Sequence, residues 1–113
     1  MKERWIEWKV VDSYKKRYVV DLYDGPSGAK LGSVLVDHVV GGLRLHVHLL
    51  DGLLSREYDI EVDAKEALRP DHFEPLVGDV ERVLPGLSGD VITAVFQAIN
   101  TVKTLNARRG AKR

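Results

Sequence analysis

Two short glycine turns divide the middle of the chain into three strand-like runs, and this pattern constrains the fold more than any other feature. The runs are Lys30–Val40, Leu43–Leu50 and Leu53–Val62, and apolar and polar residues alternate along them. Gly41-Gly42 and Asp51-Gly52 separate the runs, and two-residue loops of this kind close antiparallel hairpins because glycine tolerates a positive φ. The pattern therefore predicts a three-stranded antiparallel meander.

The two turns also predict which residues face each other. A loop at Gly41-Gly42 pairs Asp37 with His46, and a loop at Asp51-Gly52 pairs His46 with Glu57. In this register one face of the meander holds a mostly apolar set, Val34, Val36, His38, Val40, Leu43, Leu45, Val47, Leu49, Leu54, Tyr58 and Ile60. The other face holds a mostly polar set, Leu35, Asp37, Val39, Arg44, His46, His48, Ser55, Glu57, Asp59 and Glu61. A shift by one residue would mix the two sets, which favours this register.

The residues before the meander predict two further strands. Trp5–Val11 and Tyr18–Tyr23 are rich in aromatic and β-branched residues, and a polar turn separates them. Strands are thus expected over about 5–62, as one five-stranded antiparallel sheet.

The residues after the meander predict two helices. Helical apolar spacing and terminating Pro and Gly residues place them at about 75–84 and 89–108, with a basic tail over 109–113. We therefore expect a single α+β domain spanning 1–113, with both C-terminal helices packed on one face of the sheet.

The apolar side of the second predicted helix is unusually wide. Its apolar residues cover about half of the circumference, more than the ~100° stripe that contact with one sheet needs. The excess could pack against the helix over 75–84 or against a second subunit. It suggests one functional hypothesis, a non-enzymatic assembly or regulatory domain that forms a homo-oligomer through its long C-terminal helix.

Composition excludes several classes of protein. With 44% hydrophobic and 30% charged residues the chain is globular in composition, and with no cysteine it has neither disulfides nor thiolate chemistry. It shows no apolar run long enough to span a bilayer and no secretory signal, so a cytoplasmic location without membrane contact is expected. No motif for a nucleophile, a cofactor or phosphate binding stands out, so we expect no cofactor and no enzymatic activity.

The formal net charge of zero hides an uneven distribution. Residues 1–20 carry six basic and three acidic side chains, residues 101–113 carry five basic and none acidic, and residues 21–100 carry six basic and fourteen acidic. The chain is therefore basic at both ends and acidic between them.

The N-terminal basic stretch also contains aromatic residues, which makes it the strongest functional candidate. Aromatic side chains stack on unpaired bases, and Lys and Arg neutralise the phosphates beside them. Strand alternation sends Trp8 to the core but allows Trp5, Tyr14 and Tyr23 to be exposed. The candidate nucleic-acid-binding residues are Trp5, Lys9, Tyr14, Lys15, Lys16, Arg17 and Tyr23, joined by Arg108 and Arg109 of the C-terminal segment.

The order of these elements resembles that of the ThermoDBP-type single-stranded DNA-binding proteins of archaea. The resemblance rests on early aromatic strands from Trp5 to Tyr23, a meander to Val62 and a long helix over Gly89–Arg108. It implies base stacking in a cleft ringed by positive charge. The leading hypothesis is therefore a small protein that binds single-stranded DNA or RNA, as a homo-oligomer.

A third hypothesis is a small metalloenzyme. Asp37, His46, His48 and Glu57 share the polar face of the predicted meander, and imidazole and carboxylate groups are ligands that zinc and iron accept. Cross-strand pairing on a solvated sheet face explains the same residues without any metal.

Overall fold

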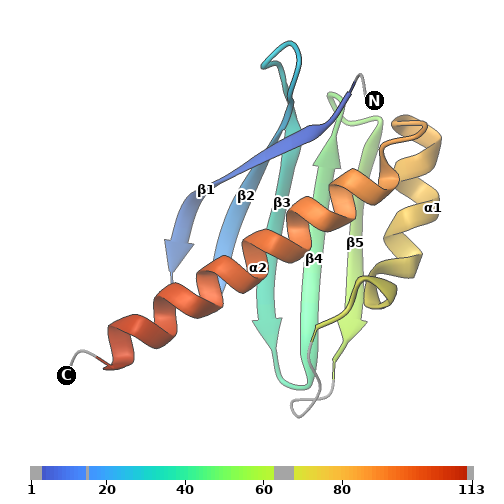
Figure 1. Ribbon diagram of the computed structural model, residues 1–113. Coiled ribbons are helices and arrows are strands. Elements are labelled where there is room, and N and C mark those ends of the chain that lie inside the picture. Colours follow the sequence, from blue (N-terminus) through green and yellow to red (C-terminus); the bar gives the residue numbers. More distant parts are fainter. Residues whose placement is uncertain (1–3, 15, 63–67, 112–113) are drawn as a thin grey trace.

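The computed structural model describes residues 4–14, 16–62 and 68–111, of which 105–111 are described through their backbone alone. It shows the expected α+β fold, with a five-stranded antiparallel sheet in the order β1-β2-β3-β4-β5 (Figure 1). The strands are β1 (Ile6–Tyr14), β2 (Arg17–Asp24), β3 (Lys30–Val39), β4 (Gly42–Leu49) and β5 (Leu54–Glu61). Each strand pairs with the next one along the chain, so the sheet is the predicted meander.

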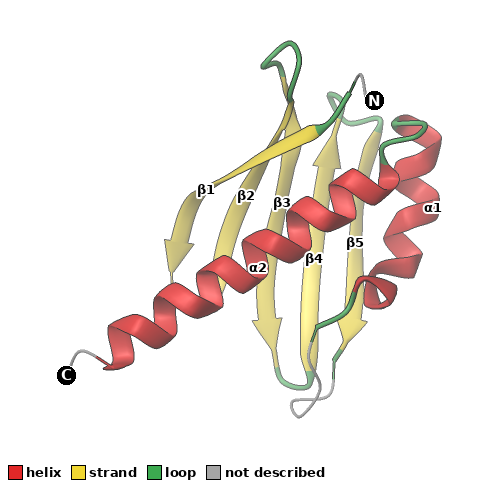
Figure 2. Ribbon diagram, in the orientation of Figure 1, coloured by secondary structure: helices red, strands yellow, loops and turns green. Residues whose placement is uncertain are grey.

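The helices cover one face of this sheet (Figure 2). They are a short 3-10 helix η1 (Pro70–Phe73), α1 (Glu74–Val83) and α2 (Ser88–Ala111). α1 lies beside β5, and α2 crosses the sheet diagonally from β5 to β1. Their apolar sides and the inner side of the sheet form one core, in which the largest fully buried side chains include Tyr18, Leu22, Leu45, Leu49, Phe73, Leu76 and Ile99. Within the part of the chain that the structure describes, no helix is long and apolar enough to cross a membrane.

The register of the β3–β4 hairpin differs from the predicted register by two residues. Asp37 lies opposite Arg44, whereas a Gly41-Gly42 loop would place His46 there. A displacement of two residues keeps side chains on their predicted faces, because successive residues of a strand alternate between faces. The apolar set is accordingly buried, except at His38, which is half-buried, and at Val40, which lies in the turn and is fully exposed.

Gly42 accounts for the displacement. It lies at the start of β4 opposite Val39, so Val40 and Gly41 form the turn. A Cβ on Gly42 would come within 2.4 Å of the carbonyl oxygen of Ile60 on β5. Glycine is therefore required at this position by the close approach of a neighbouring strand, and only Gly41, with a φ of 82°, serves the turn.

The register of the β4–β5 hairpin is confirmed. His46 lies opposite Glu57 and Arg44 opposite Asp59, as an Asp51-Gly52 loop requires. Both loop residues have positive φ, 55° and 90°, which is the backbone conformation of a type I′ turn.

The wide apolar side of α2 is covered within the molecule. Over Val91–Val102 its apolar side chains are buried or, at Phe96, half-buried, and α2 contacts β1, β2 and α1. Among its described side chains, which extend to Thr104, no large apolar one is exposed. The first of the two predicted explanations, packing against the helix before it, therefore accounts for the width of this apolar side.

Candidate nucleic-acid interface

The turn between β1 and β2 brings aromatic and basic side chains to one end of the sheet. Tyr14 and Arg17 form the last pair of this hairpin. The side chain of Tyr14 is 68% exposed, and Lys16 and Arg17 are exposed beside it. Lys15, predicted to belong to the same surface, lies outside the described residues.

His38, on β3, lies beside this turn. Its backbone N–H donates a hydrogen bond to the carbonyl oxygen of Lys16 at 2.8 Å, and its ring lies 5.9 Å from that of Tyr18. Burial lowers the pKa of His38 below its ordinary value, the positive charge of Lys103 lowers it further, Asp37 opposes them, and Lys16 adds to the lowering. Lys16 and Lys103, which are far apart in the sequence, therefore both act electrostatically on one imidazole.

The C-terminal part of α2 continues this surface. Figure 1 shows that α2 runs past the C-terminal end of β1 and extends beyond the edge of the sheet. Lys103 is exposed on this part of the helix. Arg108 and Arg109, also predicted interface residues, lie on the helical backbone that follows, and their side chains are outside the described residues. We refer to Tyr14, Lys16, Arg17, His38 and Lys103 as the basic end.

One carboxylate reduces the positive charge of the basic end. The guanidinium of Arg17 donates a hydrogen bond to Asp37 on β3 at 3.1 Å. This pairing fixes the position of Arg17 and leaves Lys16 and Lys103 as its described cations without a carboxylate partner within ion-pair distance.

The structure separates the other predicted interface residues from the basic end. Trp5 and Tyr14 lie at opposite ends of the first strand, and nine residue steps of about 3.3 Å place them about 30 Å apart. Tyr23 lies opposite Glu7, near Trp5, and its hydroxyl donates a hydrogen bond to Asp21. Trp5, Tyr14 and Tyr23 therefore do not form one aromatic platform.

Lys9 lies between the two ends. It lies opposite Asp21 in the β1–β2 pair, and Asp21 forms an ion pair with Lys30 at 3.4 Å. The surrounding carboxylates give this middle region of the sheet a mixed charge.

The uncovered face of the sheet carries further ion pairs. Arg44 contacts Glu57 at 3.1 Å and Asp59 at 2.9 Å, and these two carboxylates raise the pKa of the Arg44 guanidinium. Since the cations here are matched by carboxylates, this face offers no continuous path for a nucleic-acid backbone.

The four candidate metal ligands share this same face but do not form a metal site. His46 lies opposite Glu57, as predicted, whereas Asp37 lies opposite Arg44 and His48 opposite serines of both neighbouring strands. Among the described residues, no three His, Asp or Glu side chains are placed to hold a metal ion. The cross-strand pairs explain these residues.

The fold and the basic end thus define an α+β protein with a sheet covered on one side and a positive surface at one end. Comparisons with protein-family models, with curated proteins and with solved structures find no match to this chain.

The sequence indicated Tyr14, Lys16 and Arg17 as interface residues, but not their neighbours His38 and Lys103. The uneven distribution of charge along the sequence identified both basic segments, residues 1–20 and 101–113. No local pattern indicated that Lys103 lies near the β1–β2 turn. The crossing direction of α2 brings them together, and this direction depends on packing over the whole sheet.

Proposed function

We propose that this protein binds single-stranded nucleic acid at the basic end. The observation that carries the proposal is the meeting of two basic segments from opposite ends of the chain around His38. Exposed Lys16 and Lys103 would neutralise successive phosphates, and Arg108 and Arg109 would extend this contact along α2.

Tyr14 is the reason why we propose that the protein prefers single strands to duplexes. Its ring is the most exposed aromatic side chain of the described residues and lies beside the cations. Base–aromatic stacking requires a base whose face is accessible, which an unpaired strand offers and a duplex does not. Stacking on Tyr14 then adds sequence-independent affinity to the phosphate contacts.

The acidic surroundings limit the extent of the interface. Trp5 and Tyr23 lie beside Glu7, Asp21 and Asp24, which would repel phosphates, so the proposal does not use these two aromatic residues. The interface is confined to the end of the molecule, and a short binding site of a few nucleotides is expected.

Fluorescence anisotropy with labelled single-stranded and duplex oligonucleotides tests the proposal. We expect single strands to bind more tightly, binding to weaken as salt rises, and Lys16→Ala, Lys103→Ala and Tyr14→Ala each to lower the affinity by about fivefold or more. For Tyr14→Ala this expectation follows from the stacking of one base on an aromatic ring, which contributes about 1–3 kcal/mol.

Lys30→Ala is the matched control. Lys30 is the first residue of β3, and His38 lies near the other end of this strand. The Lys30→Ala variant therefore removes the same charge from the opposite end of β3. It should leave the affinity nearly unchanged. An equal loss in the Lys30 variant, or no binding at low salt, would contradict the proposal.

A further inference from the structure

β1 is the strand at one edge of the sheet, and we refer to its regular part, Ile6–Val10, as the free edge (Figure 1). The carbonyl oxygen of Trp5 accepts a hydrogen bond from the N–H of Gly25 at 2.9 Å, so the backbone of every second residue from Trp5 onwards points to β2. The first, third and fifth residues of the free edge therefore point their N–H and C=O groups away from β2. Among the described residues, no other strand lies on that side. Such an edge can accept a further strand.

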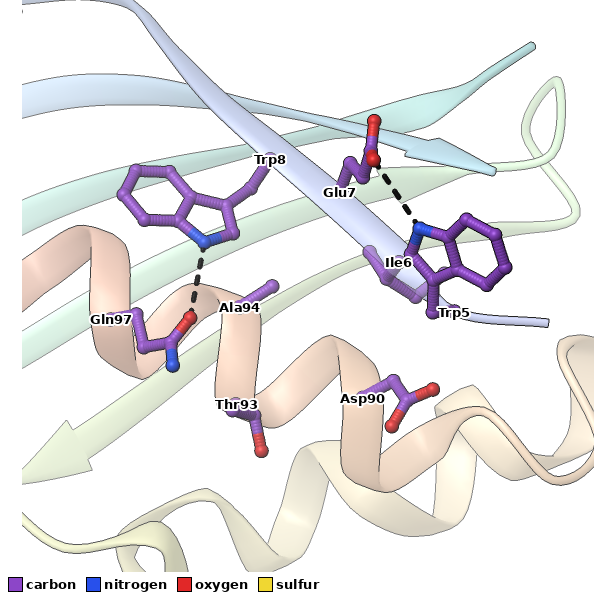
Figure 3. A pocket seen from close by; sticks show the side chains of 8 residues that line it. All are labelled: Trp5, Ile6, Glu7, Trp8, Asp90, Thr93, Ala94 and Gln97. Carbon is purple, nitrogen blue, oxygen red and sulfur yellow. Dashed lines mark hydrogen bonds between the residues drawn. The ribbon is translucent and has the colours of Figure 1, made fainter. Parts of the chain in front are cut away.

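The side chains of the free edge alternate between the two faces of the sheet. Figure 3 shows Glu7 on the side of β1 away from α2, and Trp8 on the side towards α2, where its indole N–H donates to Gln97 at 3.3 Å. Lys9 follows two residues after Glu7 and therefore shares its face. Both charged side chains are exposed. The free edge thus carries one carboxylate and one ammonium group on the uncovered face, on either side of a central tryptophan.

The order of these charges suits pairing with a second copy of the same edge. Two copies that pair antiparallel are related by a two-fold axis, and the residue on that axis sets the register. With Trp8 on the axis, Glu7 of each copy lies opposite Lys9 of the other. With Glu7 on the axis two carboxylates would face each other, and with Lys9 on it two ammonium groups would. Charge therefore selects the register that is centred on Trp8.

Apolar side chains favour the same register. The Trp8 side chain is half-buried in one copy and would lie directly opposite its equivalent in the second copy. Trp5 and Val11 flank the free edge and are 42% and 47% exposed, and the register brings Trp5 of each copy next to Val11 of the other. A second copy would thus cover apolar surface that a single copy exposes to solvent.

From this self-complementarity we infer that a second copy of the chain docks on the free edge, antiparallel and centred on Trp8, so that the two sheets join into one. α2 packs on one face of the sheet and runs past the C-terminal end of β1, beyond the free edge (Figure 1). The contact differs from the helix-mediated homo-oligomer predicted from the sequence, because the apolar side of α2 is already covered within one copy. It uses no residue of the basic end.

Analytical ultracentrifugation over a range of protein concentrations tests this dimer. We expect the parent to dimerise with a dissociation constant of about 1–100 µM, as for a small interface. Glu7→Lys and Lys9→Glu should each weaken the dimer by about tenfold or more, because pairs of like charge replace pairs of opposite charge. An equimolar mixture of the two variants should regain the dimer, since one variant then carries two cations along the free edge and the other carries two carboxylates.

Glu57→Lys is the matched control. It changes the net charge as Glu7→Lys does, but Glu57 lies on β5, at the opposite edge of the sheet, so this variant should dimerise as the parent does. A parent that remains a monomer at the upper end of the expected range, an equal loss in the Glu57 variant, or a mixture that does not regain the dimer would overturn the inference. None of these outcomes depends on nucleic-acid binding.

Discussion

Asp79 lies on the side of α1 that faces the sheet, where its carboxylate joins the helix to β5. It is 7% exposed and accepts hydrogen bonds from the hydroxyl of Tyr58 at 2.8 Å and from Arg56 at 2.6 Å, and it also pairs with Arg82. The hydrogen bond from Tyr58 lowers the pKa of Asp79 below its ordinary value of 3.8, and both arginines add to this against the effect of burial. A buried carboxylate with these partners stabilises the contact between α1 and the sheet.

We predict that Asp79→Asn lowers the free energy of unfolding at pH 7 by about 1–2 kcal/mol, because the amide keeps the bond from Tyr58 but loses the charge that holds both arginines. The pKa of Asp79 is lower in the folded state than in the unfolded chain. The Asp79 carboxylate therefore stabilises the fold fully at a pH above its ordinary pKa of 3.8, and this stabilisation is lost as the pH falls through the pKa of the folded state. Urea unfolding of the parent and of the Asp79→Asn variant should therefore show free energies of unfolding whose difference becomes smaller below pH 3.8.

Asp59→Asn is the control for this prediction. Asp59 is an exposed carboxylate that pairs with Arg44 on the uncovered face, and solvent screens such a pair. Its removal should change stability less than the removal of Asp79. A difference between parent and Asp79 variant that stays constant down to about pH 2 would contradict the assignment, since the depressed pKa requires the difference to narrow there.

At the scale of elements, two glycines have opposite roles. Gly42 lies in β4 against the backbone of β5, where a Cβ would be 2.4 Å from the carbonyl oxygen of Ile60. Gly78 lies within α1, and a Cβ there would meet no atom within 4 Å. Glycine is therefore necessary at the first position and costs helix stability at the second.

We predict that Gly42→Ala lowers the free energy of unfolding by about 1–3 kcal/mol, because backbone atoms of β4 and β5 must move apart. Gly78→Ala should raise it by about 0.5–1 kcal/mol, because alanine restricts the unfolded chain and favours a helix. Denaturant unfolding of both variants measures these changes, and each variant controls for the other. A Gly42→Ala variant as stable as the parent would contradict the close approach of β4 to β5, and a destabilised Gly78→Ala variant would contradict the open space beside α1.

The same glycine explains how far the sequence could predict the sheet. Alternation fixed which residues are buried, since it depends only on the two-residue period of a strand. The β3–β4 register was wrong because Gly41 and Gly42 are equivalent as turn residues in the sequence, and only the position of β5 distinguishes them. Asp79 was missed for a related reason, because its partners Arg56 and Tyr58 come from a strand that local patterns do not connect to α1.

At the scale of the whole molecule, charged side chains are unevenly distributed. Glu7, Asp21 and Asp24 lie beside Trp5 and Tyr23 at one end of β1, whereas Lys103 on the C-terminal half of α2 belongs to the basic end. The formal net charge of zero is thus the sum of differently charged regions. A nucleic acid would meet the positive end first, because its phosphates are repelled from the other end.

This polarity predicts a specific salt dependence. Binding of a single strand releases counterions, and the logarithm of the affinity falls with the logarithm of the salt concentration by about 0.7 for each phosphate neutralised. The double variant Arg108→Gln with Arg109→Gln should therefore reduce this slope by about 1.4 if both side chains contact phosphates. Anisotropy titrations at several salt concentrations measure the slope.

The matched control is Arg4→Gln with Lys30→Gln. It changes the net charge by the same amount, but Arg4 and Lys30 form ion pairs with Asp24 and Asp21, away from the basic end. If binding responded only to the total charge of the molecule, both double variants would reduce the slope equally. A smaller slope in the Arg108 and Arg109 variant alone requires that nucleic acid contacts the C-terminal end of α2, because counterion release reports local contacts with phosphates.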